Sequence, residues 1–102
     1  MKIPKEFRLL GQKMTVEYGN DLIRNGDSTG LACYRENKIK LQRSLEGFEM
    51  NAGQIEDTFF HELIHMILYF MSERDLAANE KFVSTFAGLL HQYEKTSKGE
   101  LK

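Results

Sequence analysis

The sequence predicts one α+β domain in which a small antiparallel β-sheet of about three strands packs against two helices. Three observations support this prediction. The length of 102 residues suits one domain with one hydrophobic core. Stretches that alternate between apolar and polar side chains come first, and two stretches with helical periodicity follow. Neither a repeat nor a linker divides the chain, so we expect a single domain over residues 1–102.

The first half of the chain contains the predicted strands. Residues 7–18 end in an alternation of Met14, Val16 and Tyr18, which indicates a strand. Gly26, Asp27 and Gly30 mark a loop.

A hairpin is predicted over residues 31–42, because apolar residues alternate on both sides of a turn near residues 36–37. Its second strand, KIKLQ, could lie at the sheet edge, where it would pair with an extended peptide or use its lysines to protect that edge. Residues 45–53 form a glycine-punctuated connection to the second half.

The second half of the chain is predicted to form two helices, over residues 54–72 and 76–95. The short SERD connection between them favours an antiparallel helical hairpin. We expect the last residues, from 96 onward, to be frayed.

Charge and composition exclude several classes of function. The chain has 14 basic and 15 acidic residues and a net charge of −1, so it lacks the electrostatic footprint of a nucleic-acid-binding protein. It has no polybasic cluster for anionic lipids, and its apolar run near residue 60 contains too many polar groups for a membrane span. The absence of an apolar signal segment and the single Cys33 predict a cytoplasmic protein. We expect Cys33 to be a strand cysteine rather than a nucleophile.

The segment His61-Glu62-Leu63-Ile64-His65 is an H-E-x-x-H motif. On a helix the two histidines lie one turn and about 40° apart, so both imidazoles can reach one ion. Glu62 lies beside them, where it can contact a water molecule on that ion. Two neutral imidazoles suit zinc, and a third ligand with one open position would make the site catalytic.

The surroundings of the motif strengthen this prediction. The polar residues of the helix fall within one stripe of about 100°, and they are Thr58, His61, Glu62, His65, Tyr69 and Ser72. Apolar side chains occupy the rest of the helix surface, so the helix is expected to be buried. Burying an unpaired glutamate and two imidazoles is unfavourable, so the stripe should face a cleft, an ion or both.

The second helix offers two candidates for the third ligand. Glu80 lies in the middle of an apolar stripe, where a carboxylate needs a cationic partner. Alternatively, Glu80 is a helix-start glutamate whose carboxylate faces water. His91 lies 20° away on the same face, and ideal hairpin geometry does not decide between them. The burial expected for Glu80 favours Glu80.

The stretches FFHELIHMILYFM and LAANEKFVSTFAGLLHQ resemble the small, often phage- or prophage-encoded zincin metallopeptidases related to the ImmA/IrrE-like group. The resemblance covers residues 54–92. It implies a minimal zincin-like fold, metal ligation by His61, His65 and Glu80, and Glu62 as the catalytic base.

These features predict a zinc-dependent peptidase with one Zn²⁺ per chain and a protein or peptide substrate. Tyr34, Tyr69 and Tyr93 are candidates for stabilising the transition state by residue type alone. Two alternatives remain: a non-catalytic zinc-binding domain, and a small interaction module without a metal.

Overall fold

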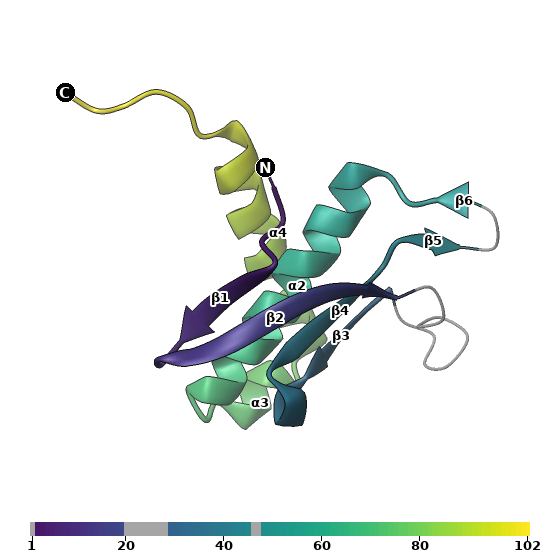
Figure 1. Ribbon diagram of the computed structural model, residues 1–102. Coiled ribbons are helices and arrows are strands. Elements are labelled where there is room, and N and C mark those ends of the chain that lie inside the picture. Colours follow the sequence, from purple (N-terminus) through teal and green to yellow (C-terminus); the bar gives the residue numbers. More distant parts are fainter. Residues whose placement is uncertain (1, 20–28, 46–47) are drawn as a thin grey trace.

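The computed structural model describes residues 2–19, 29–45 and 48–102. The strands are β1 (Glu6–Leu9), β2 (Gln12–Gly19), β3 (Gly30–Cys33), β4 (Lys38–Gln42), β5 (Ser44–Leu45) and β6 (Phe48–Glu49). The helices are the 3₁₀ turn η1 (Tyr34–Glu36), α2 (Ala52–Phe70), α3 (Arg74–Ala77) and α4 (Glu80–Thr96). Figure 1 shows these elements in the order of the chain.

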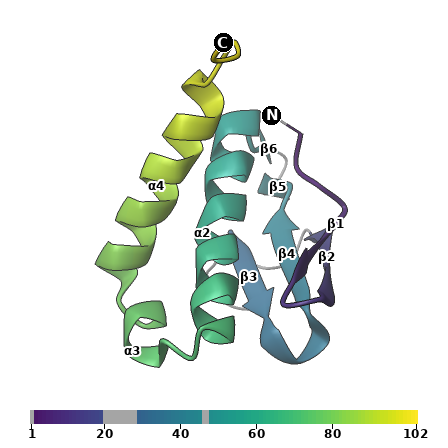
Figure 2. The same cartoon turned by 90° about the vertical axis from the view of Figure 1, so that its left-hand side faces the viewer.

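The elements form three layers, with α2 between the sheet and α4 (Figure 2). The predicted α+β class is therefore confirmed. The four-stranded sheet has the order β1-β2-β4-β3, with one more strand than expected. It is mixed rather than antiparallel, because β2 and β4 run parallel, with Val16 opposite Ile39.

The extra strand arises from a turn inside residues 7–18. Leu10 and Gly11 both have positive φ angles, 49° and 78°, and they reverse the chain between β1 and β2. Phe7 of β1 then pairs with Met14 of β2. Gly11 is a residue type that marks turns, whereas Leu10 is a non-glycine residue in the left-handed region and carries no such signal.

The predicted hairpin over residues 31–42 is confirmed. Strands β3 and β4 pair antiparallel and are joined by η1, which ends at Asn37 with a φ of 52°. The expectation that KIKLQ lies at an edge is wrong, because β4 lies between β2 and β3. Among the described strands, β3 is the edge strand on that side of the sheet.

Two other predicted loops have different outcomes. The predicted connection over residues 45–53 contains the short antiparallel ribbon β5–β6 and the first residues of α2. Gly26 and Asp27 lie outside the described residues, whereas Gly30 is the first residue of β3.

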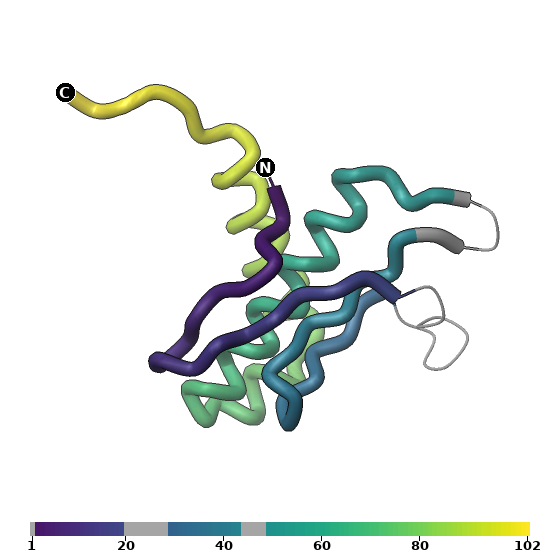
Figure 3. The backbone as a smooth tube through the Cα atoms, viewed as in Figure 1, coloured from purple at the N-terminus to yellow at the C-terminus, as the bar shows by residue number. Residues whose placement is uncertain are grey.

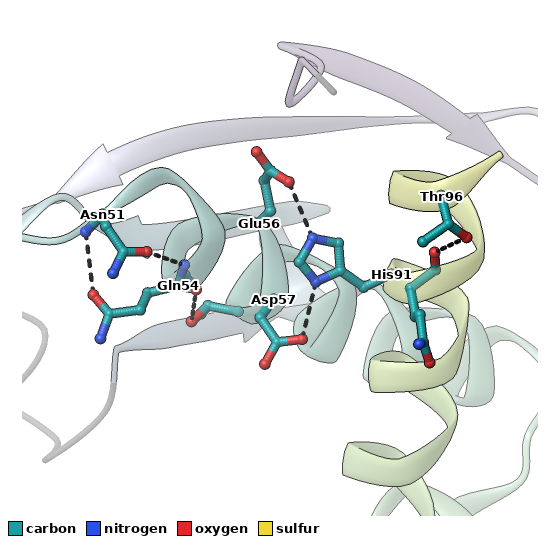
Figure 4. Close-up of polar contacts among 8 residues, drawn as sticks. Asn51, Gln54, Glu56, Asp57, His91 and Thr96 are labelled. Carbon is teal, nitrogen blue, oxygen red and sulfur yellow. Dashed lines mark hydrogen bonds and ion pairs between the residues drawn. The ribbon is translucent and has the colours of Figure 1, made fainter. Parts of the chain in front are cut away.

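The helix that carries the motif begins two residues earlier than predicted, because a capping box fixes its first turn (Figure 4). The Asn51 side chain accepts from the Gln54 amide at 2.8 Å, and Gln54 Oε1 accepts from the Asn51 amide at 3.1 Å. This satisfies two groups that a helix start otherwise leaves unpaired. The helix ends at Phe70, and the chain turns away at Ser72, whose φ is 60°.

The second predicted helix is divided into α3 and α4. Asn79 separates them, and its side chain accepts from the Phe82 amide at 3.1 Å, so it acts as the N-cap of α4. Glu80 is therefore the first residue of α4. The expected antiparallel hairpin of α2 and α4 is present, with α3 inserted in the connection (Figure 2).

The hydrophobic core lies on both sides of α2, as its apolar surface predicted. The buried core residues are Met14, Ile39, Leu41, Phe59, Phe60, Ile64, Met66, Leu68, Val83 and Ala87. The chain after α4 extends away from the body (Figure 3). No helix in the described ranges has the length and hydropathy that crossing a bilayer requires.

Candidate metal centre

Three predicted ligands meet between α2 and α4. Nε2 of His61 and Nε2 of His65 lie 3.2 Å apart. Glu80 brings Oε2 to 3.1 Å from Nε2 of His61 and Oε1 to 3.2 Å from Nε2 of His65. These donor atoms all lie within 4.8 Å of one another, so the group could hold a metal ion.

The spacing of the three donors suits a small ion with tetrahedral coordination. Ligands at the usual zinc distances of about 2.0–2.1 Å lie about 3.3 Å from one another at the corners of a tetrahedron. The observed separations of 3.1–3.2 Å are close to this value. One cation could therefore contact all three residues without a large rearrangement.

The remaining ring contacts of the two histidines favour the same arrangement. Nδ1 of His61 lies 3.4 Å from Oγ of Ser84, one turn after Glu80 on α4. The backbone of Ala77 accepts a hydrogen bond from the His65 ring. A cation bound by both Nε2 atoms requires each imidazole to carry its proton on Nδ1, and Oγ of Ser84 gives Nδ1 of His61 an acceptor for that proton.

Burial lowers the pKa of His65, and the neighbouring His61 lowers it further, while Glu80 acts in the opposite direction. Burial therefore favours the neutral imidazole. The neutral form is the one that binds a metal ion.

The prediction that Glu80 lies beside the two histidines agrees with the structure, but the reason given for it was wrong. The prediction assumed that Glu80 is buried, but its side chain is 66% exposed. Glu80 reaches the histidines because the Asn79 cap starts α4 at this residue, beside the middle of α2. Glu80 is thus a helix-start glutamate, as in the alternative prediction. Its carboxylate, however, points at the two imidazoles and not only at water.

The catalytic base predicted from the motif lies next to these ligands. Glu62 is only 8% exposed. Burial raises its pKa from 4.5 to about 7, and the charge of Glu80 contributes, while a hydrogen bond from the Ala32 amide lowers it. Glu62 is therefore a carboxylate that gains or loses a proton near neutral pH, as a general base requires.

Sequence reasoning missed two residues that shape the site. A Cβ atom on Gly30 would lie 2.5 Å from Cγ2 of Thr58 and 3.0 Å from Cγ of Glu62, so only glycine lets β3 approach α2 this closely. Ser84 was missed because a serine in a helix carries no signal of its own. Its spacing of four residues from Glu80 could have indicated a shared face.

His91, the rival third ligand, lies elsewhere along the two helices. Its Nε2 is 3.0 Å from Oε1 of Glu56, and its Nδ1 is 3.2 Å from Oδ1 of Asp57 (Figure 4). Its ring also stacks on Phe60, with centroids 5.3 Å apart. His91 therefore links α4 to the start of α2 and is not part of the candidate metal centre.

The three tyrosines have different environments. The Tyr34 ring stacks on Tyr69 at a centroid distance of 4.3 Å. Burial raises the pKa of Tyr34, and the charges of Glu62 and Glu80 raise it further. Tyr93 is largely exposed on the outer side of α4. Tyr34 is thus the tyrosine with an electrostatic link to the candidate centre.

The environment of Cys33 does not favour a nucleophile. Its side chain is partly buried at the end of β3. Burial raises the pKa of the thiol, which disfavours the reactive thiolate.

Comparison of the chain with known protein families, with characterised proteins and with solved structures finds no match. The metal-binding potential of the chain therefore rests on its own side chains. The single observation that carries it is the convergence of two imidazoles and one carboxylate, from two helices, beside a buried glutamate.

Proposed function

We propose that this protein is a zinc-dependent metallopeptidase of the zincin type. The observation that carries the proposal is the group of His61, His65 and Glu80 beside the buried Glu62. Residues 54–92 also resemble the small zincins of phages and prophages, in which an H-E-x-x-H helix is followed by a helix with an early glutamate ligand.

Zinc is the ion that best suits these donors. Two imidazole nitrogens and one carboxylate oxygen form a common catalytic zinc set, with the fourth position left for water or substrate. Magnesium and calcium prefer oxygen ligands and higher coordination numbers. One group of three donors predicts one zinc ion per chain.

The side chains around the centre supply the rest of the proposed mechanism. Bound zinc would polarise the peptide carbonyl and lower the pKa of a nearby water molecule. The Glu62 carboxylate accepts the proton of the attacking water and delivers it to the nitrogen of the leaving amine. The hydroxyl of Tyr34, whose raised pKa keeps it protonated, is the best candidate for a hydrogen-bond donor to the developing oxyanion.

The strand beside Glu62 supports a peptide substrate. β3 is the edge strand among the described strands, and the Ala32 amide already reaches Glu62. Extended peptides bind proteins by adding a strand to such an edge. An unfolded or flexible segment of a protein would therefore present its backbone close to the candidate catalytic base.

The test combines metal content with cleavage of a mixed peptide library, measured by mass spectrometry. The wild-type protein should contain one zinc per chain after reconstitution and should cleave members of the library. Glu62→Gln should retain zinc and lose at least about 100-fold in cleavage rate, the usual contribution of a general base. Glu94→Gln, an exposed glutamate on α4, is the control and should behave as the wild type.

The outcomes separate this proposal from its alternatives. A protein that binds no zinc contradicts both the peptidase and a structural zinc site. Zinc binding without any cleavage favours a non-catalytic zinc domain. Normal cleavage by Glu62→Gln contradicts the role proposed for Glu62.

A further inference from the structure

The outer side of α4 carries an exposed apolar stripe that the proposed peptidase does not use. Its residues are Phe82, Phe86, Leu89 and Tyr93, spaced by four, three and four positions. Phe86 is 48% exposed, Leu89 63% and Tyr93 66%. The stripe lines a shallow hollow of about 720 Å³, whose described lining residues all belong to the segment from Asn79 to Tyr93.

Three residues of this stripe, Phe86, Leu89 and Tyr93, are exposed, whereas Phe82 also packs against the core. The buried residues of α4 are Val83, Ala87 and His91, which lie on the side of the helix that packs on α2. At 100° per residue, Leu89 lies about 160° from Ala87 on the opposite side of the helix, and Phe86 lies about 100° from Ala87, on the flank of the helix. The helix therefore has two apolar faces, and only one of them is covered by the fold (Figure 2).

The composition of the stripe favours contact with another apolar surface. No Asp, Glu, Lys or Arg occurs between Phe82 and Tyr93, and Lys81, at one end of the hollow, is the one charged residue among its described lining residues. The 4-3-4 spacing is that of a helix-packing seam. A seam this long, about 17 Å at the helical rise per residue, matches one partner helix of similar length.

We propose that the occupant is a second copy of this chain, with the two α4 helices packed antiparallel around a two-fold axis. The axis would pass midway between Phe86 and Leu89. Phe82 of one copy would then lie level with Tyr93 of the other, and Phe86 level with Leu89. The stripe is thus self-complementary, as a two-fold interface requires, and antiparallel helix dipoles are favourable.

The available area fits a weak, reversible dimer. Apolar side chains of this size have about 200 Å² of surface each, so the exposed fractions of Phe86, Leu89 and Tyr93 amount to about 350 Å² per chain. Two chains would bury about 700 Å² from these residues, and neighbouring side chains would add to it. This is less than the roughly 1,000 Å² that a stable specific interface buries, so the dimer should be weak and transient. The candidate metal centre, on the opposite side of α4, would stay accessible.

Sedimentation of the full chain between about 10 μM and 1 mM tests the proposal. The wild-type mass should rise toward that of a dimer, and Leu89→Glu should weaken association at least tenfold. Leu10→Glu, a matched change at an exposed leucine in the β1–β2 turn, should associate as the wild type. Circular dichroism of each variant verifies the fold, and Tyr93→Glu replaces Leu89→Glu should the latter not fold.

Mixing of two variants tests the antiparallel arrangement. Leu89→Glu and Phe86→Lys should each be monomeric, but an equal mixture should associate, because the new glutamate and lysine would lie level in the mixed dimer. A wild-type protein that stays monomeric overturns the proposal, as does undiminished association of Leu89→Glu. A mixture that stays monomeric overturns the antiparallel packing.

Discussion

Oε1 of Glu80 lies 3.2 Å from Nε2 of His65, although the two residues belong to different helices. The Asn79 cap determines this contact, because it starts α4 at Glu80. The same register brings Ser84 to His61 and His91 to Glu56. One helix pair therefore carries both the candidate metal centre and a separate polar link, and each can be tested by itself.

Glu80→Gln should weaken zinc binding by at least about 100-fold, because a neutral amide replaces the anionic ligand. Competition with a chromophoric chelator measures the affinity. Glu94→Gln, on the same helix, should leave it unchanged. Equal affinities of Glu80→Gln and the wild type would exclude Glu80 as a ligand.

His91→Ala should destabilise the fold by about 3 kcal/mol without changing zinc stoichiometry. The substitution leaves Glu56, whose side chain is 13% exposed, without its imidazole partner, and breaking a buried pair costs several kcal/mol. Urea unfolding of the metal-free protein measures the stability, and elemental analysis measures the zinc content. A loss of zinc from the folded variant would contradict the separation of the two sites.

Ser84→Ala should weaken zinc binding by about 10- to 100-fold, the usual effect of removing a partner that orients a ligand. Oγ of Ser84 is the contact of Nδ1 of His61 at 3.4 Å. Thr85→Ala, the next residue and on the outer side of α4, is the control. If both substitutions change the affinity equally, Ser84 does not orient His61.

Glu62→Gln should stabilise the metal-free protein at neutral and alkaline pH. Because the folded-state pKa of Glu62 is raised from 4.5 to about 7, its proton stabilises the fold below pH 4.5, and this contribution is lost as the pH rises through 7. At pH 8 the free energy of unfolding of Glu62→Gln should exceed that of the wild type by about 3 kcal/mol, because the pKa of Glu62 is raised by about 2.5 and each pKa unit corresponds to about 1.36 kcal/mol.

Denaturation in the presence of a chelator, repeated between pH 4 and pH 8, measures this difference. The gap between the two proteins should shrink as the pH falls. A gap that does not depend on pH would show that the ionisation of Glu62 does not oppose folding.

Gly30→Ala should destabilise the protein by about 1–3 kcal/mol, because the new methyl group meets Thr58 at 2.5 Å. It should also reduce peptidase activity, since the same methyl group lies 3.0 Å from Cγ of Glu62. Gly88→Ala is the matched control, with no atom within 4 Å of its added Cβ. It should stabilise α4 by about 0.5–1 kcal/mol. Thermal unfolding of both variants measures these opposite effects.

The α+β class and the helix with the paired histidines could be predicted from local patterns in the sequence. The period at which apolar residues recur predicts helices and strands, because it reflects which side chains lie on one face of the element. The spacing of His61, Glu62 and His65 is a local property of one helix, so their proximity needed no tertiary information. The capping box at Asn51 and the turn at Leu10 were missed, because each depends on backbone conformation more than on an apolar pattern.

Which residue of α4 lies beside the histidine pair could be told from the tertiary structure alone. Glu80 and His91 share one face of α4, and the level of each against α2 depends on where the Asn79 cap starts that helix. The parallel pairing of β2 with β4, and hence the position of β3 beside Glu62, also joins segments far apart in the chain. Local patterns determine which face a residue occupies, whereas the register between two elements comes from packing that no single segment encodes.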